Sequence, residues 1–75
     1  MTVQGAISQA FKEQSAGIFD NGKFHLIFLV PYIRVLTGRP WLPDESVTRE
    51  MRDLRQKGEI NYRNIDKSTS YYEKL

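Results

Sequence analysis

Cysteine is absent from this sequence, and histidine occurs once, as His25. Disulfide bonds and thiolate metal sites are therefore excluded, and His25 cannot form a zinc site without several carboxylates. The first residues show no basic region followed by an apolar run, and the apolar stretch from Leu26 to Ile33 is too short to cross a bilayer. We therefore expect a cytoplasmic protein that has no cofactor and does not enter membranes.

The sequence also lacks the residue patterns of a catalytic site. It contains no cluster of metal ligands and no glycine-rich loop suited to cradling a phosphate group. His25 has no nucleophile or carboxylate placed to work with it as a general base. We therefore predict that the protein is not an enzyme and that its function is binding.

Excess charge of either sign is small, because eleven basic and nine acidic side chains give a net charge of +2. Proteins that bind the nucleic-acid backbone normally carry many lysines and arginines. Residues 44–75 contain seven basic and seven acidic side chains, so this part of the chain is neutral as a whole. Attraction to an anionic partner must therefore come from the local placement of charges.

The composition is typical of one small globular domain over residues 1–75. The chain is 40% hydrophobic and 27% charged, and its length is near the lower end for an independently folding domain. Apolar residues at helical spacing predict three helices, over about residues 2–16, 27–37 and 45–57. Gly17 and Gly58 are expected to end the first and third helices, and Asp44 to cap the third. Pro31 is expected in the first turn of the second helix, where its missing amide hydrogen is tolerated.

Alternation of apolar and polar residues predicts three strands, over about residues 23–25, 60–65 and 70–74. Asp20-Asn21-Gly22 supplies a turn before the first strand, and the polar segment 66–70 joins the last two into a hairpin. The predicted fold class is therefore α+β, with three helices, a short strand after the first helix and a C-terminal hairpin.

Four segments carry a resemblance to a known family: Phe24-His25-Leu26, the helix end from Arg49 to Gly58, the strand at Tyr62, and the closing Tyr72-Glu73-Lys74-Leu75. Over about residues 23–75 the chain resembles the winged helix-turn-helix family and, more loosely, the C-terminal winged domain of methyladenine-dependent restriction endonucleases of the Dpn type. The resemblance implies that the third helix lies in the DNA major groove and that the hairpin is the wing. Nuclease activity and methyl-base recognition do not carry over, because no metal-dependent nuclease motif is present.

The third helix is expected to turn Val47, Met51 and Leu54 inward, which leaves polar residues on its opposite side. Arginine can pair with guanine, glutamine with adenine, and serine with a base edge or a phosphate. The connection before this helix and the tip of the hairpin are placed to touch the DNA backbone. The candidate DNA-binding residues are Arg39, Ser46, Arg49, Arg52, Asp53, Gln56, Arg63, Lys67 and Ser68.

We therefore predict a non-catalytic protein that binds double-stranded DNA, for instance a small transcription regulator, with a homodimer or a protein partner adding contact surface. The alternative is a protein-interaction or inhibitor module, of the kind that phages or mobile elements encode, built on the same scaffold. The neutral charge of residues 44–75 favours this alternative, as do Phe19, Phe28, Tyr32 and Trp41, which a small core cannot all hide. In that case the helix arginines only pair with nearby acids and keep the helix soluble.

Overall fold

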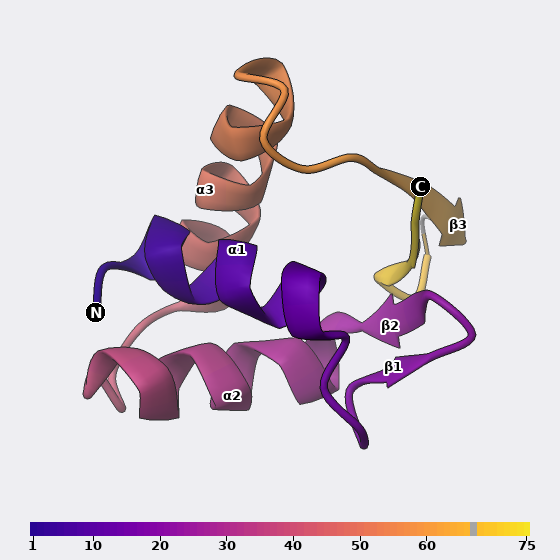
Figure 1. The fold of residues 1–75 in the computed structure, drawn as a ribbon. Coiled ribbons are helices and arrows are strands. Elements are labelled where there is room, and N and C mark those ends of the chain that lie inside the picture. Colours follow the sequence, from indigo (N-terminus) through magenta and orange to yellow (C-terminus); the bar gives the residue numbers. More distant parts are fainter. Residues whose placement is uncertain (67) are drawn as a thin grey trace.

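The computed structural model describes residues 1–66 and 68–75 of the chain. Within these residues the protein is a small α+β domain, in which three helices pack beside a four-stranded antiparallel sheet (Figure 1). The helices are α1 (Val3–Glu13), α2 (Leu26–Thr37) and α3 (Asp44–Gln56). The strands are β1 (Phe19–Asp20), β2 (Lys23–His25), β3 (Tyr62–Asp66) and β4 (Tyr71–Lys74). The predicted α+β class and the three predicted helices are confirmed.

The sheet joins the middle of the chain to its last strand. Its strand order is β1-β2-β4-β3, and each pair of neighbours is antiparallel. Phe24 of β2 lies opposite Tyr72 of β4, and Tyr72 in turn lies opposite Asn64 of β3. The hairpin formed by β3 and β4 is thereby fixed to the strand that leads into α2.

One hydrophobic core is shared by the helices and the sheet. Helix α1 packs against both α2 and α3, so the inner faces of all three helices meet. The ring of Phe11 lies edge-on to the rings of Phe19 and Phe24, at centroid distances of 5.5 and 5.1 Å. Edge-to-face contacts are a favoured geometry of aromatic pairs. The core therefore extends from the helices under β1 and β2.

The sequence pattern does not predict strand β1, so the observed element order contains one more strand than expected. The signal is nevertheless present, because Asn-Gly is the preferred central pair of a two-residue hairpin turn. Asn21 and Gly22 both adopt positive φ angles, of 52° and 78°. Helix α1 also ends earlier than predicted, at Glu13, because Gln14 takes a left-handed conformation with φ 47°.

Two predicted details of the helix starts are wrong. Pro31 is the sixth residue of α2 rather than part of its first turn. The hydrogen bond that proline cannot donate would go to the carbonyl of Ile27, and both residues lie on the exposed side of the helix, where water can replace it. Asp44 does not cap α3, since Pro43 holds the capping position and Asp44 is the first helical residue.

Candidate nucleic-acid interface

Helix α3 turns its apolar stripe inward, as predicted. Val47, Met51 and Leu54 are at most 1% exposed. The chain after Gly58 forms strands, and Gly58 itself takes the positive φ of 80° that allows the helix to end there. The polar side of α3 therefore faces outward beside the hairpin.

Three depressions follow one another across α3. A groove of about 500 Å³ lies at its start and is lined by Arg39, Ser46 and Arg49 together with the first residues of α1. A shallower one, of about 250 Å³, is lined by Arg49, Arg52, Asp53 and Gln56. A cleft of about 360 Å³ separates α3 from the hairpin and is lined in part by Arg52 and Arg55.

These depressions share arginines, because Arg49 borders the first two and Arg52 borders the last two. We call Arg39, Arg49, Arg52 and Arg55 the arginine path. Six of the nine residues predicted to bind DNA, from Arg39 to Gln56, are brought together along it. The structure thus gathers four arginines along neighbouring depressions, the first two of which are also lined by Glu50 and Asp53.

Most of the acids on α3 are bound by neighbouring basic or amide groups. Asp44 lies 3.4 Å from the guanidinium of Arg34, and Glu50 lies 3.8 Å from Arg49. Asp53 forms an ion pair of 3.1 Å with Lys57. The repulsion that these acids would exert on a phosphate is reduced, although Glu50 also weakens the contribution of Arg49.

Asp53 is tied to α1 rather than free to contact bases. Its Oδ2 accepts a hydrogen bond of 2.6 Å from Nε2 of Gln4, and the same oxygen receives the ammonium of Lys57. The hydrogen bond from Lys57, followed by that from Gln4, lowers the pKa of Asp53 below its usual range. The matching contact raises the pKa of Lys57. Asp53 therefore remains ionised and positions α3 against α1.

The candidate residues of the hairpin make contacts within the hairpin. Arg63 forms an ion pair of 2.7 Å with Glu73, directly across the β3–β4 ladder. The amide and hydroxyl of Ser68 both donate to Oδ1 of Asp66, and these hydrogen bonds lower the pKa of Asp66. Lys67 lies outside the described residues. Neither Arg63 nor Ser68 borders any of the three depressions on α3.

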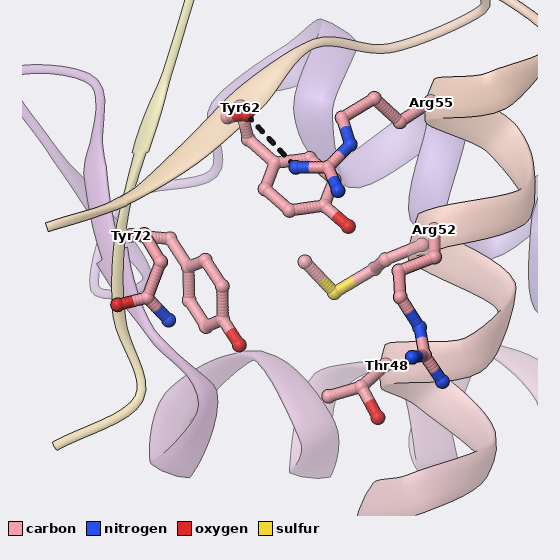
Figure 2. A pocket seen from close by; sticks show the side chains of 7 residues that line it. Thr48, Arg52, Arg55, Tyr62 and Tyr72 are labelled. Atoms are coloured by element: carbon pink, nitrogen blue, oxygen red, sulfur yellow. Dashed lines mark hydrogen bonds between the residues drawn. The ribbon is translucent and has the colours of Figure 1, made fainter. Parts of the chain in front are cut away.

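Arg55 belongs to the arginine path, although it is not among the residues predicted from the sequence to bind DNA. Its guanidinium lies over the ring of Tyr62, 4.4 Å from the centroid, and Nη1 donates a hydrogen bond of 3.4 Å to the carbonyl of Tyr62 (Figure 2). Two contacts hold this cation at the wall of the cleft. The sequence signal that could have predicted this role is the spacing of Thr48, Arg52 and Arg55, which places all three on one side of a helix.

The wall of the cleft opposite α3 is formed by Tyr62, Asn64 and Tyr72 of the hairpin. Figure 2 shows Tyr62 and Tyr72 with their hydroxyl groups directed into the cleft. Burial raises the pKa of Tyr62, so its hydroxyl stays protonated and can donate a hydrogen bond at neutral pH. Asn64 also lines the cleft, and its buried Oδ1 has no hydrogen-bond partner among the described residues. Such an unpaired acceptor costs about 1–3 kcal/mol.

No family model, curated protein or solved structure matches this chain. In the part of the chain that the structure describes, no group of three or more metal-ligating side chains comes together. None of the described helices combines the length and the apolar character needed to span a bilayer.

Proposed function

We propose that this chain is a winged helix-turn-helix domain that binds double-stranded DNA without catalysing a reaction. In this proposal α3 enters the major groove and the hairpin approaches the backbone. The arrangement of three helices, with the terminal hairpin anchored on β2 beside α3, supports the fold assignment. The arginine path carries the functional proposal, because it gathers three cations on the outer side of α3 and a fourth, Arg39, in the connection before it.

Three arginines of the path and the neighbouring Gln56 have suitable roles in binding DNA. The guanidinium groups of Arg49 and Arg52 can pair with guanine edges, and Gln56 can pair with adenine. Arg39, in the connection before α3, is placed to bind a backbone phosphate. A monomer of this size would bury little surface on DNA, so a dimer on two half-sites would give higher specificity.

The test compares two variants with equal loss of charge. Arg49→Gln with Arg52→Gln removes two cations from the path, whereas Lys12→Gln with Lys23→Gln removes two cations that border none of the three depressions. Fluorescence anisotropy with random and selected duplexes, across a salt series, measures affinity and its salt dependence. We expect the path variant to lose at least about tenfold in affinity for selected duplexes and to discriminate less between selected and random ones, because the lost base contacts carry the sequence preference.

The control variant should lose much less affinity than the path variant. Equal losses would show that attraction is spread over the surface rather than concentrated on α3. Absence of binding by the unmodified protein at low salt would contradict DNA binding altogether.

A second candidate function is protein interaction, and the outer side of α2 favours it. Ile27, Phe28 and Val35 are 66%, 57% and 78% exposed, and Trp41 in the following connection is 72% exposed. Exposed apolar side chains that gather on one element often mark a protein contact. A complex of fixed stoichiometry that forms equally well in high salt, combined with no DNA binding, would favour this function.

A further inference from the structure

The cleft between α3 and the hairpin, formed by Thr48, Met51, Arg52, Arg55, Tyr62, Asn64 and Tyr72, has features that general attraction to DNA does not require. Arginines anywhere along α3 could attract DNA through their charge alone. Arg52 and Arg55, in contrast, border a cleft that is also lined by the aromatic residues Tyr62 and Tyr72. Its volume of about 360 Å³ falls in the range of small-molecule sites, which is roughly 300–1,000 Å³.

One end of the cleft is suited to an anion. Arg52 and Arg55 bring two guanidinium groups, and none of the residues that line the cleft is acidic. Neither arginine forms an ion pair among the described residues. Because Arg55 is held over Tyr62, little side-chain freedom is lost when it binds a ligand. Guanidinium groups in such a fixed position are well suited to phosphate.

The other features point to a planar group with hydrogen-bond donors. The ring of Tyr72 is fixed by stacking on Phe24, with a centroid distance of 5.4 Å and an interplanar angle of 14°. Met51 adds an apolar surface to the lining. The unpaired Oδ1 of Asn64 needs a donor, which a phosphate at neutral pH does not supply but the amino or imino group of a nucleobase does.

We propose that this cleft binds a nucleotide unit, with its phosphate at Arg52 and Arg55 and its base beside Tyr72 and Asn64. The Oδ1 atom of Asn64 is buried although the residue is partly exposed, so rotation of the side-chain amide would bring this acceptor to the base. A free mononucleotide or one nucleotide of a nucleic-acid strand carries this chemistry. The proposal does not require DNA binding along the whole arginine path, so each can fail alone.

The test is an NMR titration of the ¹⁵N-labelled chain with AMP, GMP, CMP and UMP, and with ribose 5-phosphate as the ligand that lacks a base. We expect saturable shifts at residues 48–55 and 62–72 with at least one mononucleotide. That mononucleotide should bind at least about fivefold more tightly than ribose 5-phosphate, because stacking of one base adds that much or more.

Arg55→Gln and Arg63→Gln form the matched pair of variants, since each removes one cation near the hairpin but only Arg55 borders the cleft. Arg55→Gln should weaken nucleotide binding by about tenfold or more, through loss of a charge-assisted contact, and Arg63→Gln should weaken it less than about twofold. Thermal unfolding of both variants checks that they remain folded. If Arg55→Gln unfolds, Arg52→Gln takes its place.

A duplex that carries 2-aminopurine separates the two sources of the ligand. Increased fluorescence on binding, lost in Arg55→Gln, identifies a nucleotide taken from a strand, while unchanged fluorescence together with mononucleotide binding identifies a free nucleotide. Absence of cleft shifts with all four mononucleotides up to about 10 mM, or equal weakening by both variants, overturns the proposal. DNA affinity that still depends on Arg49 and Arg52 would leave the DNA-binding proposal intact in that case.

Discussion

Helices α2 and α3 pack into the same core, but the residues on their outer sides differ in polarity. Each buries an apolar stripe, represented by Leu29 and Ile33 in α2 and by Val47 and Leu54 in α3. The rest of α3 is almost entirely polar or charged, whereas the outer side of α2 exposes further apolar residues and its only charged residue is Arg34. A helix that is apolar all round is normally buried. Helix α3 therefore has the apolar inner side and polar outer side of a surface helix, while the apolar outer side of α2 supports the proposed contact with another protein.

The largest expected effect tests whether the inner sides of the two helices are equivalent. Leu29→Ala in α2 and Leu54→Ala in α3 each remove a side chain that is at most 1% exposed. Each should lower the free energy of unfolding by about 2–5 kcal/mol, through lost burial and the cavity left behind. Urea denaturation measures both. A loss below about 1 kcal/mol for either variant would show that its helix is not part of the common core.

The next effect concerns the left-handed glycines at the two helix ends. Gly38 directly follows α2 and Gly58 lies two residues beyond the end of α3, with φ angles of 66° and 80°. An added Cβ would meet no other atom within 4 Å at either position, so Gly38→Ala and Gly58→Ala should cost only the left-handed backbone energy. That cost is about 1–2 kcal/mol for each variant. Thermal or urea unfolding that separates the two by more than about 1 kcal/mol would contradict this equivalence.

A smaller effect on stability, with a specific effect on association, is expected on the outer side of α2. Ile27→Ser with Val35→Ser should change the free energy of unfolding by about 0.5 kcal/mol or less per site, since both side chains are largely exposed. The same variant should reduce self-association or binding of a protein partner in analytical ultracentrifugation. DNA affinity should stay within about twofold of the unmodified chain. A large loss of DNA affinity would mean that the two outer sides do not act separately.

The smallest expected effect is on acid stability, and it distinguishes the helices because α2 contains no carboxylate. The pKa of Asp53 in α3 is lowered by Lys57 and Gln4, so its contribution to stability is present above the unfolded pKa of about 3.9. This contribution disappears as pH falls through the lower pKa of the folded state. An NMR titration of the carboxyl carbon should show that Lys57→Met raises the pKa of Asp53 more than Gln4→Ala does. The reverse order would contradict the ranking of the two contacts.

Residue periodicity was sufficient to predict the three helices and the direction in which α3 faces. The spacing of Val47, Met51 and Leu54 in the sequence is enough to predict that all three side chains are buried on one side of a helix. Strand β1 was not predictable by the same reasoning, because two residues are too few to show alternation. Its turn sequence, Asn21-Gly22, was the only available signal.

The residues of the candidate site were predictable where they lie on a single helix. They were not predictable where they depend on contacts between elements that are distant in the sequence. Arg49, Arg52 and Gln56 follow from a helical wheel. The contact between Gln4 and Asp53 joins residues 49 positions apart, and the ion pair of Arg63 with Glu73 depends on the register of the hairpin. The cleft at Arg55 likewise exists only because the hairpin turns back beside α3, which local spacing does not determine.

Strand β4 lies between β2 and β3, so the most interior pairing of the sheet is made by residues 71–74. During synthesis, a nascent chain can form its helices before these residues leave the ribosome, but β2 and β3 have no partner between them until then. The sheet therefore closes only after translation has passed this segment. Until that moment both strands are exposed edges, and these are the part of the molecule at which newly made chains would aggregate.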